Sequence, residues 1–230
     1  LTCWAKSKYL SARTVKSGGV RKTLRSCISS TSLFMASSDD SRPKIYTRTG
    51  DKGTSATFTG QRRRKDDAVF EALGATDELN SHIGYVRSLL GHPEVSKQLK
   101  WVQCLLQDLQ AAIATPNSSA SEGHKMKTEF PAEHIKELEQ WIDAHSESLP
   151  PLRNFILPSG SPAGAALHVA RSVCRRAERS CLFVLRVTTL FLDDEVDEVV
   201  MRYINRLSDY LFVAARICSH HENAEEVIYK

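Results

Sequence analysis

Four arginines and one glutamate, a cluster that favours binding of an anion, lie close together in the sequence: Arg171, Arg175, Arg176, Glu178 and Arg179. The stretch has helical apolar spacing, and at about 3.6 residues per turn Arg171, Arg175, Glu178 and Arg179 share one face. Like charges four residues apart on a helix repel each other. The pattern therefore predicts a neutralising group outside the helix. A solvated face held by weak ion pairs is the alternative, and this stretch alone does not exclude it.

A second stretch with the chemistry of phosphate binding is the glycine- and threonine-rich segment 43–60. Glycines let a backbone approach a ligand closely, hydroxyl and amide groups donate hydrogen bonds, and Arg48 and Lys52 add positive charge. The segment is not a Walker A loop, because Gly-x-x-x-x-Gly-Lys-Ser/Thr does not occur in it. An ordinary polar turn is the alternative for this segment taken by itself.

The apolar periodicity predicts the elements that must position these side chains. Helices are expected at about 66–91, 94–114, 131–145, from the turn at Pro162 to about 185, and 195–221. Residues 117–128 are expected to form a polar loop, and the apolar tripeptide 155–157 is expected to form a buried plug. These elements predict an all-α fold, a five-helix up-and-down bundle preceded by an N-terminal nucleotide-binding loop.

Composition limits the function classes. The 230 residues are 41% hydrophobic and 25% charged, which suits one domain with a tail. Seven basic residues and no acidic residue lie in positions 1–38, so removing these seven charges from the net charge of +4 leaves −3. An acidic body argues against a nucleic-acid-binding surface. No apolar run reaches the roughly 20 residues that a membrane span requires.

The six cysteines do not have the spacing of a zinc site, because no Cys-x-x-Cys occurs. Cys174 and Cys181 lie on the apolar stripe of the arginine helix, where buried structural thiols are expected. A redox pair is the alternative.

Composition and apolar periodicity along the chain predict three regions. They are residues 1–42 as a transit peptide or disordered leader, residues 43–222 as the helical bundle, and residues 223–230 as a C-terminal tail. The leader is rich in Ser, Thr, Lys and Arg and contains no apolar core of a secretory signal. This composition indicates the mitochondrial matrix, with the plastid as the alternative.

Three ordered stretches carry a family resemblance: 47–53, 75–80, and 155–179 together with 205–209. With them the chain resembles the corrinoid adenosyltransferases of the propanediol-utilisation type, and its leader is similar to that of the mitochondrial, eukaryotic form. The resemblance implies a homotrimer with active sites between subunits. It also implies transfer of the 5′-deoxyadenosyl group of ATP, with Mg²⁺, to the cobalt of cob(I)alamin, a corrinoid reductase and an adenosylcobalamin-dependent mutase as partners, and no nucleic acid or membrane partner.

The resemblance also implies roles for particular residues. Asp77 and Arg171 match a pair that bridges neighbouring subunits, and Phe155 matches the aromatic ring beneath the corrin. The expected catalytic residues are Phe155, Arg175, Glu178 and Arg179. The matches to the ATP-contacting residues are Thr47, Arg48, Thr49, Gly50, Ser55, Ala56, Lys65, Arg175, Arg176, Ala177, Glu178, Arg179 and Asn205.

Two features depart from the family pattern. Relatives often have Ser or Thr where this chain has Ala56, and the connection 188–194 is longer than in close relatives. A non-catalytic cobalamin carrier, a helical interaction module and a phosphohydrolase are the rival functions. The module leaves the loop and the Phe155 turn unexplained, and the sequence contains no convincing cluster of metal-binding carboxylates for a phosphohydrolase.

Overall fold

The computed structural model describes residues 46, 48–189 and 197–230, except for the side chains of 185–189. The chain divides into two compact units, Leu1–Lys52 and Gly53–Lys230, and every described helix and strand belongs to the second. Two short strands come first, β1 (Thr54–Ala56) and β2 (Arg62–Arg64). The helices are α2 (Ala68–Leu89), α3 (Pro93–Ile113), α4 (Glu122–Thr128), α5 (Glu133–Glu147), α6 (Pro162–Thr189) and α7 (Glu198–His221).

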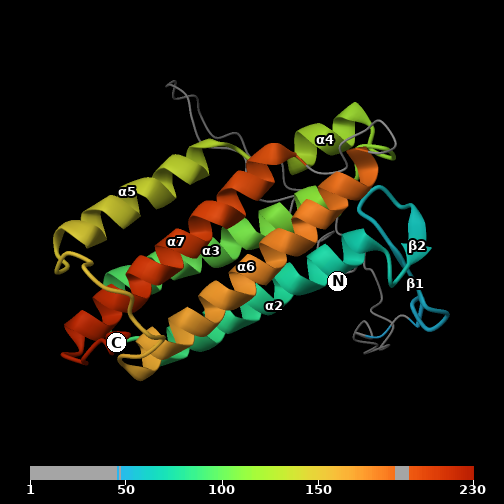
Figure 1. Cartoon of the computed structure of the whole chain (residues 1–230). Helices are drawn as coiled ribbons and strands as arrows, with labels where there is room; N and C mark the ends of the chain where they lie inside the picture. Colours follow the sequence, from blue (N-terminus) through green and yellow to red (C-terminus); the bar gives the residue numbers. More distant parts are fainter. Residues whose placement is uncertain (1–45, 47, 190–196) are drawn as a thin grey trace, which may run out of the picture. The chain divides into compact units, whose positions relative to one another are not determined.

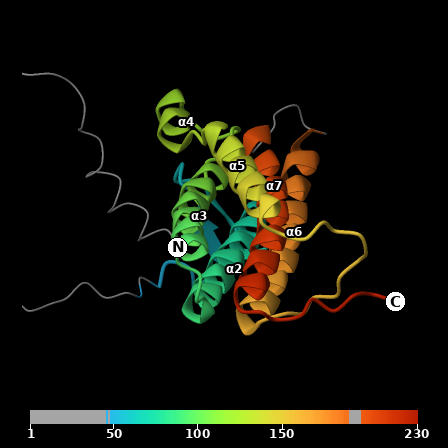
Figure 2. The ribbon, with the colours of Figure 1, turned by 90° about the vertical axis from the view of Figure 1, so that its left-hand side faces the viewer.

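The second unit is a bundle of long helices (Figure 1). Helix α6 packs against both α2 and α7, α7 also packs against α5, and α2 packs against α3. Figure 2 shows the bundle turned by 90° from Figure 1, with α6 beside α7 on one side and α2 and α3 on the other. The five long helices confirm the predicted all-α bundle.

Apolar stripes explain why the helices pack as they do. On α6, Leu167, Ala170, Cys174, Ala177 and Cys181 are completely buried, as their spacing predicts. The cysteines behave as structural thiols. The Cys174 thiol donates to the Ile204 carbonyl at 3.3 Å. Burial raises the pKa of Cys174 and raises that of Cys181 to about 12.

Side-chain caps fix the starts of the helices that carry the site. The Asp67 carboxylate accepts from the backbone N–H of Val69 at 2.9 Å at the start of α2, and the Asp197 carboxylate accepts from Val199 at 2.9 Å at the start of α7.

The structure corrects one prediction about a local element. The segment predicted as a polar loop at 117–128 contains α4, whose start is stabilised by a capping box between Ser121 and His124. Seven residues are too few to display apolar periodicity, which is why the helix was missed. Strand β1 lies within the glycine-rich segment and pairs antiparallel with β2, which follows that segment. No helix among the described residues is long and apolar enough to cross a membrane.

Close packing at the start of α6 gives a stability prediction. A methyl group added at Gly164 would contact the buried Ser219 hydroxyl and lie 3.1 Å from the Ala215 carbonyl oxygen. We expect Gly164→Ala to lower the free energy of unfolding by about 1 to 3 kcal/mol, because the site has no room for it.

The matched control is Gly74→Ala in α2, where an added methyl group meets nothing within 4 Å. This change is expected to raise the free energy of unfolding by up to about 1 kcal/mol through helix propensity. Urea denaturation of both variants measures the difference, and equal effects would contradict the packing argument.

Candidate functional site

The charged face of α6 is separated from its buried stripe. Arg175, Arg176 and Arg179 are exposed, whereas Arg171 and Glu178 are half-buried. The predicted face is therefore confirmed as a row of cations on the solvent side of a helix whose other side packs in the core.

The arginines differ in their partners. The Arg176 guanidinium forms an ion pair with Glu78 on α2, and this hydrogen bond lowers the pKa of the Glu78 carboxyl. The Arg179 guanidinium donates to the Arg175 carbonyl oxygen at 3.2 Å. No ion pair within the described residues involves Arg175 or Arg179. Their two positive charges are therefore available to an external anion.

Glu178 is oriented by the neighbouring helix. The Asn205 amide on α7 donates to one Glu178 carboxylate oxygen at 2.7 Å. Next to Asn205, the Arg206 guanidinium donates to Glu139 on α5 at 3.1 Å and to Asp209 at 2.9 Å. The structure thus brings Arg175, Glu178, Arg179 and Asn205 together on adjoining faces of α6 and α7. These four of the family's implied site residues on the two helices form one cluster, whereas Arg176 is turned to Glu78 on α2.

Arg171 has an incomplete set of contacts. Its Nε atom is buried and has no hydrogen-bond partner among the described residues. Asp77 on α2 is half-buried, and no ion pair joins it to Arg171 within the chain. A buried guanidinium N–H without an acceptor is costly, so this geometry leaves a position for an acceptor from outside the chain.

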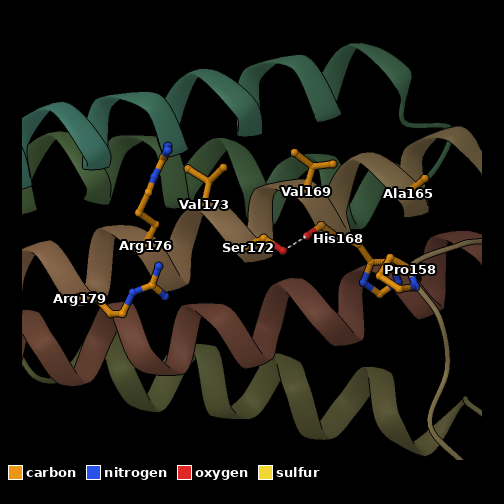
Figure 3. A pocket seen from close by; sticks show the side chains of 8 residues that line it. All are labelled: Pro158, Ala165, His168, Val169, Ser172, Val173, Arg176 and Arg179. Atoms are coloured by element: carbon orange, nitrogen blue, oxygen red, sulfur yellow. Dashed lines mark hydrogen bonds between the residues drawn. The ribbon is translucent and has the colours of Figure 1, made fainter.

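A groove of about 510 Å³ runs along α6 from Arg176 and Arg179 at one end to Pro158 at the other (Figure 3). Between these ends it is lined by Ala165, His168, Val169, Ser172 and Val173. The His168 ring is buried and its Nδ1 atom has no partner among the described residues. Burial, followed by the charge of Arg171, lowers the pKa of His168. An imidazole of this kind is neutral at pH 7.

Phe155 lies on the turn that precedes α6, and its side chain is 84% exposed. The prediction of a buried plug at 155–157 is therefore wrong for the single chain. Leu157 is exposed as well, and Ile156 forms an isolated antiparallel bridge with Ile228 near the chain's end. An exposed aromatic ring without packing is what a ligand-facing role requires.

The predicted ATP loop is distributed over both units. Thr47 lies outside the described residues. In the first unit, Arg48, Thr49 and Gly50 belong to a turn closed by the Asp51 N–H and the Arg48 carbonyl at 3.3 Å. Arg48 has φ of 56°, and its guanidinium lies 5.4 Å from the centre of the Tyr46 ring. A left-handed conformation at a non-glycine residue is a marker of functional turns.

In the second unit, Ser55 and Ala56 are half-buried in β1, and Lys65 is exposed just after β2, where its N–H donates to the Gly53 carbonyl at 2.9 Å. Ala177 is completely buried in the core. Its methyl group therefore faces the core, and only the backbone of that turn lies near the charged face.

A comparison with known protein families identifies the family to which this chain belongs. The model of a family described as cobalamin adenosyltransferase matches residues 45–218. The chain belongs to this family of cobalamin adenosyltransferases.

Individual proteins with similar sequences carry the name corrinoid adenosyltransferase as well. The chain is 55% identical over 191 residues to corrinoid adenosyltransferase MMAB from Bos taurus, covering 82% of this chain and 76% of the relative. It is 54% identical over 190 residues to the Homo sapiens protein of the same name, covering 81% and 73%. It is 38% identical over 191 residues to corrinoid adenosyltransferase from Bacillus subtilis (strain 168), covering 81% and 92%.

A solved structure is similar as well. A phenylalanine-to-alanine variant of a PduO-type ATP:corrinoid adenosyltransferase from Lactobacillus reuteri, complexed with cobalamin and ATP, matches with a TM-score of 0.71 and 35% identity. The match covers 81% of this chain and 99% of that one. The fold of this cobalamin adenosyltransferase is therefore the fold of PduO-type enzymes.

Sequence reasoning missed several residues that shape the site of this adenosyltransferase. Glu78 neutralises Arg176, and Arg216 and Glu226 form an ion pair near the Phe155 turn. The sequence shows that Glu78 is next to Asp77, but it does not show that Glu78 pairs with Arg176 on another helix. No group of three or more metal-ligating side chains is present in the described part of the chain.

Proposed function

We propose that this chain transfers the 5′-deoxyadenosyl group of ATP to the cobalt of cob(I)alamin and releases triphosphate. Family membership and the names of the relatives support the reaction. The observation that carries it in this chain is the pair of cations Arg175 and Arg179, which no acidic side chain of the described residues neutralises, beside a carboxylate held by Asn205. The pair matches the triphosphate, which gains negative charge as it leaves.

The electron balance of the step explains the absence of a protein nucleophile. The electron pair of Co(I) forms the bond to C5′, the bond from C5′ to oxygen breaks, and its pair leaves with the triphosphate. No proton has to be moved by the protein. The chain contributes fixed charge and alignment, which lower the barrier without a general base.

Arg175 and Arg179 hold the triphosphate in this proposal, and Arg176, while paired with Glu78, contacts the nucleotide from the edge of the groove. The turn at Arg48, Thr49 and Gly50 supplies backbone N–H groups and one guanidinium to the nucleotide. Ser55, Ala56 and Lys65 contribute from the hairpin, with Ala56 limited to a backbone contact. Thr47 is assigned to the same loop.

Glu178 is the residue that would hold Mg²⁺, directly or through water. Its donor type fits, because Mg²⁺ in nucleotide sites binds few carboxylates and fills its remaining positions with phosphate oxygens and water. The Asn205 amide occupies only one carboxylate oxygen. When bound, Mg²⁺ supplies positive charge to the triphosphate.

The active form is a homotrimer in which Arg171 of one subunit pairs with Asp77 of its neighbour. The buried, unpartnered Arg171 Nε supports this arrangement. Phe155 lies beneath the corrin and keeps the lower axial position of cobalt empty. The enzyme works in the mitochondrial matrix with a corrinoid reductase and passes its product to an adenosylcobalamin-dependent mutase.

The test is an anaerobic assay of the full chain with cobalamin reduced to Co(I), Mg²⁺ and ATP. Adenosylcobalamin and triphosphate are expected in equal amounts, measured by corrinoid absorbance and phosphate analysis. Removing Mg²⁺ with EDTA is expected to slow the reaction by about 100-fold, because several kcal/mol of charge stabilisation are lost. Tight corrinoid binding without either product would overturn the proposal in favour of a carrier.

A further inference from the structure

The C-terminal segment is paired with the Phe155 turn, although about 70 residues of sequence separate them. The Leu157 N–H donates to the Val227 carbonyl at 2.8 Å, and the Tyr229 N–H donates to the Phe155 carbonyl at 2.8 Å. These two bonds flank the bridge between Ile156 and Ile228. The segment predicted as a tail is therefore one strand of a short antiparallel ribbon, and Phe155 is on the other.

The Ser159 hydroxyl closes the ribbon at its inner end. It accepts from the Val227 N–H at 3.0 Å and donates to the Leu157 carbonyl at 2.8 Å. Because the Phe155 side chain is almost entirely exposed, packing does not hold its position. The direction in which the side chain leaves the main chain is set by the backbone, and the backbone is held by the C-terminal strand.

One buried guanidinium fastens both strands to α7. Arg216 is 8% exposed, and its Nε and Nη2 atoms donate to the two Glu226 carboxylate oxygens at 2.9 and 3.3 Å. The Nη2 atom also donates to the Pro150 carbonyl at 3.0 Å. Glu226 begins the C-terminal strand, and Pro150 precedes the Phe155 strand. A two-pronged pair of this type fixes direction as well as distance.

We propose that Arg216 and Glu226 are positioning residues for Phe155. Their ion pair sets the register of the C-terminal strand, whose backbone hydrogen bonds then hold the Phe155 ring in place. The role in the reaction rests on the proposed function, since Phe155 acts there on the corrin. The ordering of the ribbon does not rest on the proposed function, so the ordering and the role in the reaction can be tested separately.

The experiment compares Glu226→Ala with Glu225→Ala in the full chain. Glu225 is the exposed neighbour, so it provides the same change without loss of the Arg216 pair. The first readout is hydrogen exchange at the Leu157 and Tyr229 amides. In Glu226→Ala their protection is expected to fall by about 10-fold or more, because local opening becomes easier, while the amides of α3 keep their protection. Unchanged protection at both amides would overturn the proposal.

The second readout is the ratio of the adenosylation rate from cob(II)alamin with a reductant to the rate from prereduced cob(I)alamin. The ratio is expected to fall by about 10-fold in Glu226→Ala. It is expected to recover partly in Glu226→Gln, because the amide oxygen keeps a hydrogen-bond acceptor for Arg216. A general loss of stability would lower both rates together. Lost protection with an unchanged ratio would overturn the positioning role, whereas failure of the wild-type chain to form adenosylcobalamin would overturn the proposed function instead.

Discussion

Phe155→Ala is expected to slow adenosylation that starts from cob(II)alamin by about 100-fold, equivalent to about 3 kcal/mol of barrier. The reason is the state of the lower axial position of cobalt. Co(II) with an axial ligand is hard to reduce, and an apolar ring beneath the corrin excludes both water and the nucleotide base. Without the ring, a ligand occupies that position, and the reduction to Co(I) becomes unfavourable.

The same variant is expected to react nearly normally when cobalamin is chemically reduced to Co(I) first. Four-coordinate Co(I) is then already present, and in the proposed mechanism the displacement at C5′ uses the arginines and the loop, which the substitution leaves intact. Equal losses under both conditions would contradict this role of the ring.

Leu152→Ala is the control for Phe155→Ala. Leu152 is an exposed apolar residue of the same segment, so its truncation removes comparable surface without changing the ring. Both rates are expected to stay at their wild-type values. Electron paramagnetic resonance of Co(II) in the ATP complex provides a direct measurement, because it distinguishes the four-coordinate from the five-coordinate form.

The exposure of Phe155 also shows where reasoning from sequence fails. The apolar sequence Phe-Ile-Leu predicts burial in the core, because removing apolar side chains from water is favourable. The structure leaves Phe155 and Leu157 exposed and pairs the backbone of the turn with residues 227–229. Pairing between distant segments depends on register and closure, which local periodicity does not encode.

The helices were predictable for a physical reason. A stripe such as Leu167, Ala170 and Cys174 has a period that only a helix packed on one side satisfies. The partners of the charged residues were less predictable, because Arg176 meets Glu78 and Arg216 meets Glu226 only after the bundle has formed. The site was therefore predictable as a set of residue types on a face, and the choice of which arginines stay uncompensated came from the structure.

Arg171→Trp is expected to abolish adenosylation and to shift the protein from trimer toward monomer. In the proposed trimer the indole leaves the Asp77 carboxylate of the neighbouring subunit without its partner in a buried interface, a loss of about 3 to 5 kcal/mol. The loss recurs at every interface of a closed ring, and a bulky ring also replaces a guanidinium whose Nε atom is buried. Sedimentation velocity measures assembly, and the Co(I) assay measures turnover.

Two further variants separate the ion pair from the bulk of the indole. Arg202→Trp places the same ring at an exposed position on α7 and is expected to leave the trimer intact. Combining Arg171→Asp with Asp77→Arg exchanges the partners, and recovery of the trimer by this pair, when each single change disrupts it, would identify a direct contact between subunits. A trimeric Arg171→Trp protein with normal ATP affinity and turnover would contradict the proposal, because neither assembly nor catalysis would then depend on a pair between Arg171 and Asp77 of the neighbouring subunit.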